Sequence, residues 1–223
     1  MYMAAILFTG KILPSYFDDL LEQTKAIQNK FASVWDNEDS NYIQQLIDNN
    51  FTIIKSEVDQ QKYFNAQFIP IVNGLTYLKE HGFEYVLRTR FDVISKDYGK
   101  YLDIIKNKYP EKITVISGIQ TDTIYFLQII ESGKIDDMCR FYSLQDINDK
   151  RYPEKFLMES FTNKINLTRD EIKDIFNFSL ETCIENSIEF FWYRSEGWKS
   201  PLRTIPDMKV INEYCKDTFI WTN

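Results

Sequence analysis

Short apolar runs alternate with amphipathic segments along the first half of the chain. Residues 3–9 form an apolar run that ends at Gly10, a pattern typical of a strand buried on both faces of a parallel sheet. Similar runs predict strands at 32–35, 51–55, 85–90 and 113–117. Helical periodicity between them predicts helices at 15–30, 42–48, 60–80 and 98–108, the third kinked or divided by Pro70. This alternation predicts an α/β fold in which helices cover both faces of a mainly parallel sheet.

The pattern changes after Gly118. Residues 124–130 are apolar and are compatible with either a strand or a helix, whereas 135–142 has helical spacing. Pro153 suits the start of another helix, and Thr168 with Glu171 has the spacing of a capping box. We therefore expect a helical, aromatic-rich C-terminal part. We interpret residues 1–223 as a single domain, with an α/β half at 1–120 and a cap at 121–223.

Composition excludes several kinds of function. The 223 residues carry a formal charge of −7, so nucleic acid is not an expected partner. One histidine and three dispersed cysteines exclude histidine-rich metal sites and cysteine zinc clusters. Neither a G-x-G-x-x-G fingerprint nor a phosphate loop ending in G-K-[ST] is present.

The sequence also bears on the compartment. Charged residues interrupt every apolar run before it reaches the length of a membrane helix, so we expect no transmembrane segment. The apolar residues 1–8 are too few for a signal peptide, and three scattered cysteines are typical of a reducing compartment. We expect a cytoplasmic protein.

Three charged residues follow one another on one face of the predicted strand at 85–90. Because strand side chains alternate, Arg88, Arg90 and Asp92 project to the same side. One interpretation is a structural ion pair that closes a turn. The other is that the arginines bind phosphate oxygens while Asp92 holds a hard divalent cation bridging a diphosphate. Thr9, Gly10 and Lys11 follow the first strand, and ligands of open α/β sheets bind at such strand ends. Lys11 is equally compatible with a solvated loop lysine.

A family resemblance rests on this order of motifs. The first strand with its T-G-K end, the segment YVLRTRFDV, then GIQTDTIYF and YPEKFLMESF resemble WavE-type glycosyltransferases of surface-polysaccharide synthesis. More broadly, residues 3–165 resemble nucleotide-sugar transferases of the GT-A fold, a Rossmann-like architecture. The resemblance implies that Asp92 binds a metal, Mn²⁺ or Mg²⁺. It also implies that Asp122 and Glu154 face the acceptor or the transferred sugar. The chain contains no D-x-D, so Arg90-Phe91-Asp92 stands in its place.

The functional hypothesis is a glycosyltransferase. It would move a sugar from a nucleoside diphosphate donor to a glycan or lipid-linked acceptor. Arginine and metal would stabilise the leaving diphosphate, and Asp122 or Glu154 would accept the proton of the acceptor hydroxyl. Asp122 also suits a turn or helix cap, and Glu154 the first turn of a helix. The alternatives are a non-catalytic α/β domain that binds a nucleotide or a protein, and a phosphoryl or nucleotidyl transferase.

Overall fold

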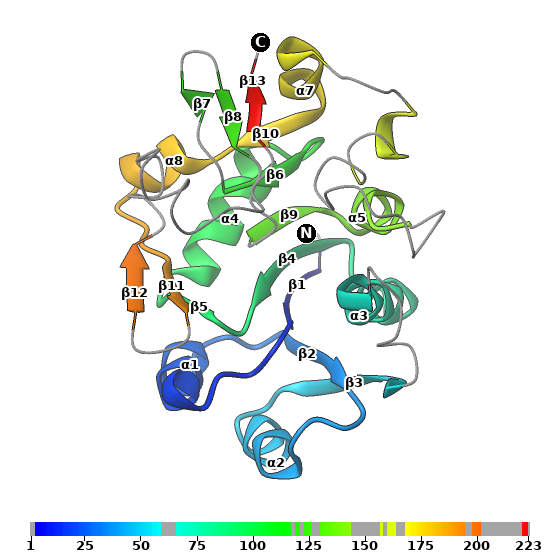
Figure 1. Ribbon diagram of the computed structural model, residues 1–223, viewed down its shortest axis with the longest axis vertical. Coiled ribbons are helices and arrows are strands. Elements are labelled where there is room, and N and C mark those ends of the chain that lie inside the picture. Colours follow the sequence, from blue (N-terminus) through cyan, green and yellow to red (C-terminus); the bar gives the residue numbers. More distant parts are fainter. Residues whose placement is uncertain are drawn as a thin grey trace.

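The structure, a computed structural model, is an α/β fold built on a mixed seven-stranded sheet (Figure 1). It describes residues 3–58, 66–116, 119–120, 123–125, 130–143, 157, 160–163, 168–194, 198–201 and 220–222. The strand order is β10-β6-β9-β4-β1-β2-β3. The strands are β1 (Ala4–Thr9), β2 (Lys30–Trp35), β3 (Thr52–Ser56), β4 (Tyr85–Arg90), β6 (Ile113–Val115), β9 (Ile130–Lys134) and β10 (Phe176–Phe178).

Most of the sheet is parallel. β1 lies in the middle and pairs in parallel with both β2 and β4, and β3 extends the sheet beyond β2. β9 is the exception, because it runs antiparallel between β4 and β6. The predicted mainly parallel α/β fold is thus confirmed. The antiparallel strand β9 was not predicted, since the pattern at 124–130 favoured neither strand nor helix and gave no direction.

Helices cover both faces of the sheet, and each face has its own hydrophobic core (Figure 1). One face holds α1 (Phe17–Thr24), α2 (Ser40–Asp48), α4 (Tyr98–Lys108) and α8 (Leu180–Glu185). The other holds α3 (Ile69–Glu80), α5 (Ile135–Phe141) and α7 (Arg169–Ile175).

Helix α3 packs against the sheet at a glycine, where no room is left for a side chain. A Cβ added at Gly74 would come within 2.8 Å of the Leu7 methyl carbons and 3.2 Å of Ser33 Cβ. Two hydrogen bonds fix the helix there: Ser33 Oγ donates to the Pro70 carbonyl at 2.6 Å, and Asn73 donates to Ser56 Oγ at 2.8 Å. These contacts anchor α3 to β1, β2 and β3.

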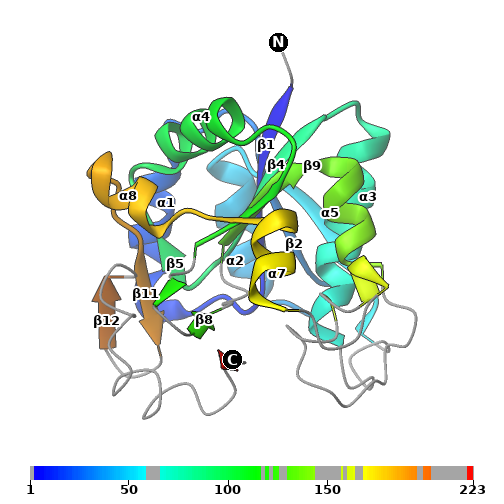
Figure 2. The ribbon, with the colours of Figure 1, turned by 90° about the horizontal axis from the view of Figure 1, so that it is seen from above.

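Two small sheets stand near the end of the molecule to which β1 and β4 point (Figure 2). Their strand orders are β12-β11-β5 and β13-β8-β7. The first comprises β5 (Val93–Ile94), β11 (Phe191–Arg194) and β12 (Trp198–Pro201), and the second β7 (Ile119–Gln120), β8 (Thr123–Tyr125) and β13 (Ile220–Thr222). Because β5 directly follows Asp92, the first small sheet borders the end of β4.

Two helix starts differ from their predictions. Pro70 lies in the first turn of α3, where a missing N–H costs nothing, and a short 3₁₀ turn at Ala66–Phe68 precedes it. The chain before α1 forms a 3₁₀ turn at Pro14–Tyr16, and Tyr16 at the N-cap makes no side-chain capping bond. The sequence also has Ser15 and Asp18 at the spacing of a capping box, but this prediction is wrong, since neither start has a side-chain cap. The Thr168–Glu171 capping box of α7 is confirmed.

Candidate functional site

The predicted site residues of β1 and β4 meet at the carboxyl ends of these two central strands. Thr9 lies opposite Arg90 in the parallel register, and the Phe91 N–H donates to the Thr9 carbonyl at 3.1 Å. From β1 the chain builds β2 and β3 on one side and then returns to form β4 on the other. Strand order therefore reverses between β1 and β4, which is where open α/β sheets bind ligands.

Gly10 allows the chain to turn away directly after β1. Its φ of +88° lies in the left-handed region, which strains any residue with a side chain. A Cβ at this position would also face Arg90 Cγ at 3.9 Å. Lys11 follows in the same loop and is exposed. The backbone at Gly10 and the side chain of Lys11 are thus both available at the switch point.

Arg90 and Asp92 form a two-pronged ion pair at this edge. Arg90 Nε donates to one Asp92 carboxylate oxygen at 2.8 Å and Nη2 donates to the other at 2.6 Å. The side chain of Arg90 is 38 % exposed and that of Asp92 9 % exposed. Of the two interpretations of these charges, the structure shows the ion pair itself, with Arg90 as the member that reaches solvent.

Arg88 lies deeper, within the sheet. Its Nη1 donates to Glu131 Oε2 at 3.0 Å and its Nε to Thr9 Oγ1 at 3.0 Å. Glu131 stands directly opposite it on β9, and the two side chains are 6 % and 0 % exposed. Arg88 is therefore bound to neighbouring strands, while phosphate binding by Arg88 stays a prediction.

The signs of four charges alternate from the sheet interior to its edge. They are negative at Glu131, positive at Arg88, negative at Asp92 and positive at Arg90. Burial raises the pKa of Glu131, and Arg88 offsets part of that rise. Burial alone would lower the pKa of Arg88, but the charge of Glu131 and smaller contributions from Tyr142 and Asp92 raise it. The guanidinium of Arg88 consequently stays charged: it is hydrogen-bonded to Glu131, and the charge of Asp92 adds to its stabilisation.

A metal ion at Asp92 would need further ligands. Both oxygens of Asp92 accept hydrogen bonds from Arg90. Within the described part of the chain, His, Cys, Asp and Glu nowhere gather in threes that could hold a metal. The described residues by themselves do not fit a divalent cation, and the role of Asp92 as a ligand stays a prediction.

The predicted catalytic carboxylates Asp122 and Glu154 lie outside the described residues. Glu131, in contrast, was missed although it contacts Arg88. The one signal in the sequence was an acidic residue directly after the apolar residues Ile129 and Ile130, at the end of a segment whose structure the pattern left open. Its partner is distant in sequence, and only the antiparallel placement of β9 brings the two together.

The single histidine, two of the cysteines and Phe190 have structural roles. His81 is the C-cap residue of α3, and its ring stacks on Tyr77 with the centroids 3.8 Å apart. Cys183 is buried in the core against α4 and Cys139 is half-buried, both as free thiols. Phe190, from the aromatic-rich segment, packs edge-on against Tyr98 and Tyr101. None of these side chains lies in the site.

Among known proteins, no family model and no curated protein matches the chain. Among solved structures, the crystal structure of HddC from Yersinia pseudotuberculosis complexed with GMP-PN is 11% identical, with a TM-score of 0.41, covering 67% of this chain and 82% of HddC. Of the helices that the structure describes, none has the length and apolar character needed to cross a bilayer. Fold and site together define an α/β protein with a charged cluster at its topological switch point.

Proposed function

We propose that the chain is a glycosyltransferase that moves a sugar from a nucleoside diphosphate donor to a glycan or lipid-linked acceptor. The observation that carries the proposal is the position of Gly10, Lys11 and Arg90 at the switch point between β1 and β4. An anionic ligand placed there would meet two cationic side chains and a backbone that, at Gly10, has no Cβ to obstruct it.

Arg90 is the expected diphosphate ligand. Its guanidinium already forms a planar two-pronged contact with one oxyanion, the carboxylate of Asp92, and phosphate oxygens suit the same geometry. Its partial exposure allows a ligand to reach it from solvent. Fixed positive charge at this position would stabilise the leaving diphosphate as negative charge develops on it.

Arg88 and Glu131 would act as positioning residues. The Arg88–Glu131 pair and the Arg88–Thr9 hydrogen bond tie β9, β4 and β1 together next to the ligand. A rigid support of this kind holds Gly10 and Arg90 in one geometry before the ligand arrives. The acceptor proton would go to a carboxylate, for which Asp122 and Glu154 stay the predicted candidates.

The test is thermal unfolding with a panel of nucleoside diphosphates and their sugars, each with and without Mn²⁺ or Mg²⁺. A nucleotide present at about 100 times its Kd should stabilise the fold by about 2.7 kcal/mol, which is measurable as a rise in Tm. A rise in Tm that depends on the metal would support the predicted role of Asp92. An equal metal-dependent rise in the Asp92→Ala variant would contradict that role.

The variant Arg90→Gln tests the diphosphate contact. We expect it to lose most of the nucleotide-induced rise in Tm, relative to its own ligand-free value, because the bidentate donor is gone. Lys55→Gln changes an exposed residue of the edge strand β3 and should respond like the wild type. Equal ligand responses in all three proteins would refute the site.

A non-catalytic binding domain is the second candidate. The observation that favours it is that Arg88 and Arg90 each have a carboxylate partner within the protein. Nucleotide binding without transfer or hydrolysis of the sugar would support this function. A flat response to the whole panel would support a domain that binds a protein.

A further inference from the structure

The ion pair of Arg90 and Asp92 leaves little room for the metal binding that the family resemblance implies for Asp92. Both carboxylate oxygens of Asp92 accept hydrogen bonds from Arg90, at 2.8 Å from Nε and at 2.6 Å from Nη2. A divalent cation binds a carboxylate through these same oxygens, so it would have to displace the guanidinium. The charge of Arg88 interacts with Asp92 as well. Two guanidinium groups therefore oppose the approach of a cation.

Arg90 is held both at its backbone and at its tip. It lies opposite Thr9 in the parallel register, and the N–H of the next residue, Phe91, donates to the Thr9 carbonyl at 3.1 Å. At the tip, the Asp92 side chain that receives the guanidinium is only 9 % exposed, so the protein covers most of it. A long arginine side chain loses rotamer freedom when a ligand orders it. The contact with Asp92 imposes part of that order before a ligand binds.

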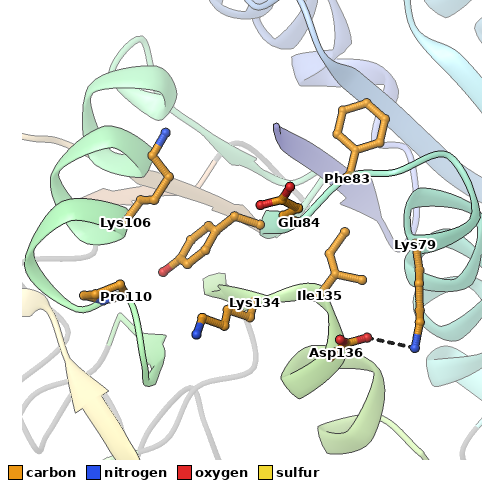
Figure 3. Close-up of a pocket in the computed structure, with 9 residues that line it drawn as sticks. Lys79, Phe83, Glu84, Lys106, Pro110, Lys134, Ile135 and Asp136 are labelled. Carbon is orange, nitrogen blue, oxygen red and sulfur yellow. Dashed lines mark ion pairs between the residues drawn. The ribbon is translucent and has the colours of Figure 1, made fainter. Parts of the chain in front are cut away.

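An exposed ion pair at the other end of β4 shows the contrast. Lys79 and Asp136 line a cavity of about 350 Å³ there, and Lys79 Nζ contacts one Asp136 oxygen at 2.8 Å (Figure 3). Their side chains are 58 % and 79 % exposed, and a single-point contact between exposed groups fixes neither of them. The Arg90–Asp92 contact has two parallel bonds to a covered carboxylate, so it sets both the position and the plane of the guanidinium.

The guanidinium of Arg90 can serve a carboxylate and a phosphate at once. A guanidinium has five N–H donors, and the contact with Asp92 engages Nε and Nη2 on one of its edges. Arg90 is 38 % exposed, whereas Asp92 lies behind it. A diphosphate arriving from solvent would therefore meet Arg90 first, already oriented by the carboxylate.

We propose that Asp92 is a positioning residue that holds Arg90 in place for the donor diphosphate and contributes no ligand to a metal ion. This role rests on the proposed glycosyltransferase function, and it replaces the role that the family resemblance implies for Asp92. Binding of the diphosphate to Arg90 consequently requires no metal ion held by Asp92.

The first test measures the affinity of the full chain for a diphosphate by calorimetry in the presence of EDTA. The probe is the nucleoside diphosphate with the largest effect on Tm, or inorganic pyrophosphate if none has an effect. Asp92→Asn keeps the shape of the side chain but loses its charge and one acceptor oxygen, and we expect binding weaker by about fivefold or more. Removing a negative charge beside an anion would by itself tighten binding, so weaker binding identifies lost positioning.

The matched control is Asp103→Asn, which makes the same change of charge on helix α4. The Asp103 side chain is 74 % exposed and lies 3.7 Å from Lys106, so this variant should bind the diphosphate like the wild type.

The second test uses Mn²⁺ and the ligand-free wild type, so it requires neither a nucleotide nor a stable variant. Mn²⁺ bound by Asp92 would broaden the NMR signals of the nearby amides. We expect the amides of Arg90 and Asp92 to keep their intensity at the Mn²⁺ concentration used with the nucleotides. The Arg90 Nε–H signal, identified by its absence from Arg90→Gln, should also persist, because Asp92 still accepts its hydrogen bond.

The outcomes separate this role from the proposed function. Unchanged or tighter diphosphate binding by Asp92→Asn would overturn the positioning role, as would Mn²⁺ broadening centred on Asp92 that this variant abolishes. Weaker binding by Asp92→Asn, together with intact signals in Mn²⁺, would support it. Absence of any diphosphate binding by the wild type would instead refute the glycosyltransferase proposal, and the positioning role with it.

Discussion

The buried pair of Arg88 and Glu131 is the residue-scale feature with the largest expected energetic effect. Neither side chain is more than 6 % exposed, so each charge depends on the other for compensation. Glu131→Gln removes the carboxylate that pairs with the buried Arg88 guanidinium, and we expect a loss of about 3–5 kcal/mol in the free energy of unfolding. Urea unfolding at pH 7 measures this loss.

Asp136→Asn is the matched control for that change. It breaks the ion pair with Lys79, whose two side chains are 58 % and 79 % exposed. Solvent screens such a pair, so the loss should be much smaller than that of Glu131→Gln. Similar losses in the two variants would show that the burial of the Arg88–Glu131 pair does not matter.

Part of the site could be predicted at this scale. Strand alternation placed Arg88, Arg90 and Asp92 in one row, and the structure confirms that Arg90 pairs with Asp92. Alternation does not report depth, however, so it could not distinguish the buried Arg88 from the partly exposed Arg90. The two residues differ in their neighbours on β9, because Glu131 stands opposite Arg88, whereas the pairing of β4 with β9 that the structure describes reaches only Thr89 with Ile130.

At the scale of elements, we expect opposite effects on stability when two helical glycines are replaced by alanine. Gly74 of α3 has Leu7 within 2.8 Å of any added Cβ, whereas Gly99 of α4 has open space around it. Gly74→Ala should destabilise the fold. Overpacking the core costs about 1–3 kcal/mol, which exceeds the gain of about 1 kcal/mol from the higher helix propensity of alanine. Gly99→Ala should stabilise it by about 0.5–1 kcal/mol.

Chemical denaturation of the two glycine variants gives the comparison directly. Their helix propensities change by the same substitution, so a difference in sign isolates the packing of α3 against β1. Stabilisation by both substitutions would mean that Leu7 moves aside at little cost, and α3 would then not lie as tightly on the sheet as the structure shows.

The elements themselves were largely predictable because local patterns decide them. Helix α4 has the predicted bounds, and the predicted strands correspond to β1, β2, β3, β4 and β6. The helix expected over 15–30 covers only Phe17–Thr24, since Pro14 favours a 3₁₀ turn before it. β9 is short, contains Glu131 and Gly133, and pairs only with strands distant in sequence, so no local pattern identified it.

On the scale of the whole molecule, the core contains several protonated acids that resist ionisation. Burial raises the pKa values of Tyr85 and Cys183 to about 12 and those of Tyr98 and Tyr101 further. In the unfolded chain, the pKa of a phenol is about 10 and that of a thiol about 8.5. The buried tyrosines and Cys183 therefore make their full contribution to the free energy of unfolding below about pH 8.5. This contribution is lost as the pH rises toward 12.

The expected result is a urea midpoint that stays level from pH 7 to 8 and falls steadily above pH 9. Absorbance at 295 nm should show the ionisation of Tyr98 and Tyr101 only together with unfolding, since both are buried. Titration of all tyrosines near pH 10 in the folded protein would contradict the assignment. Tyr85→Phe should reduce the slope of the alkaline loss.

The position of β9 between β4 and β6 has a consequence for synthesis on the ribosome. β4 is complete at Arg90, but the strand that covers its outer edge ends only at Lys134. At typical translation rates of about 5–20 residues per second, the nascent chain carries this uncovered edge for roughly 2–9 s. During that interval the N-terminal half presents unpaired backbone groups at the centre of its future sheet, and chaperone binding there would protect it from other nascent chains.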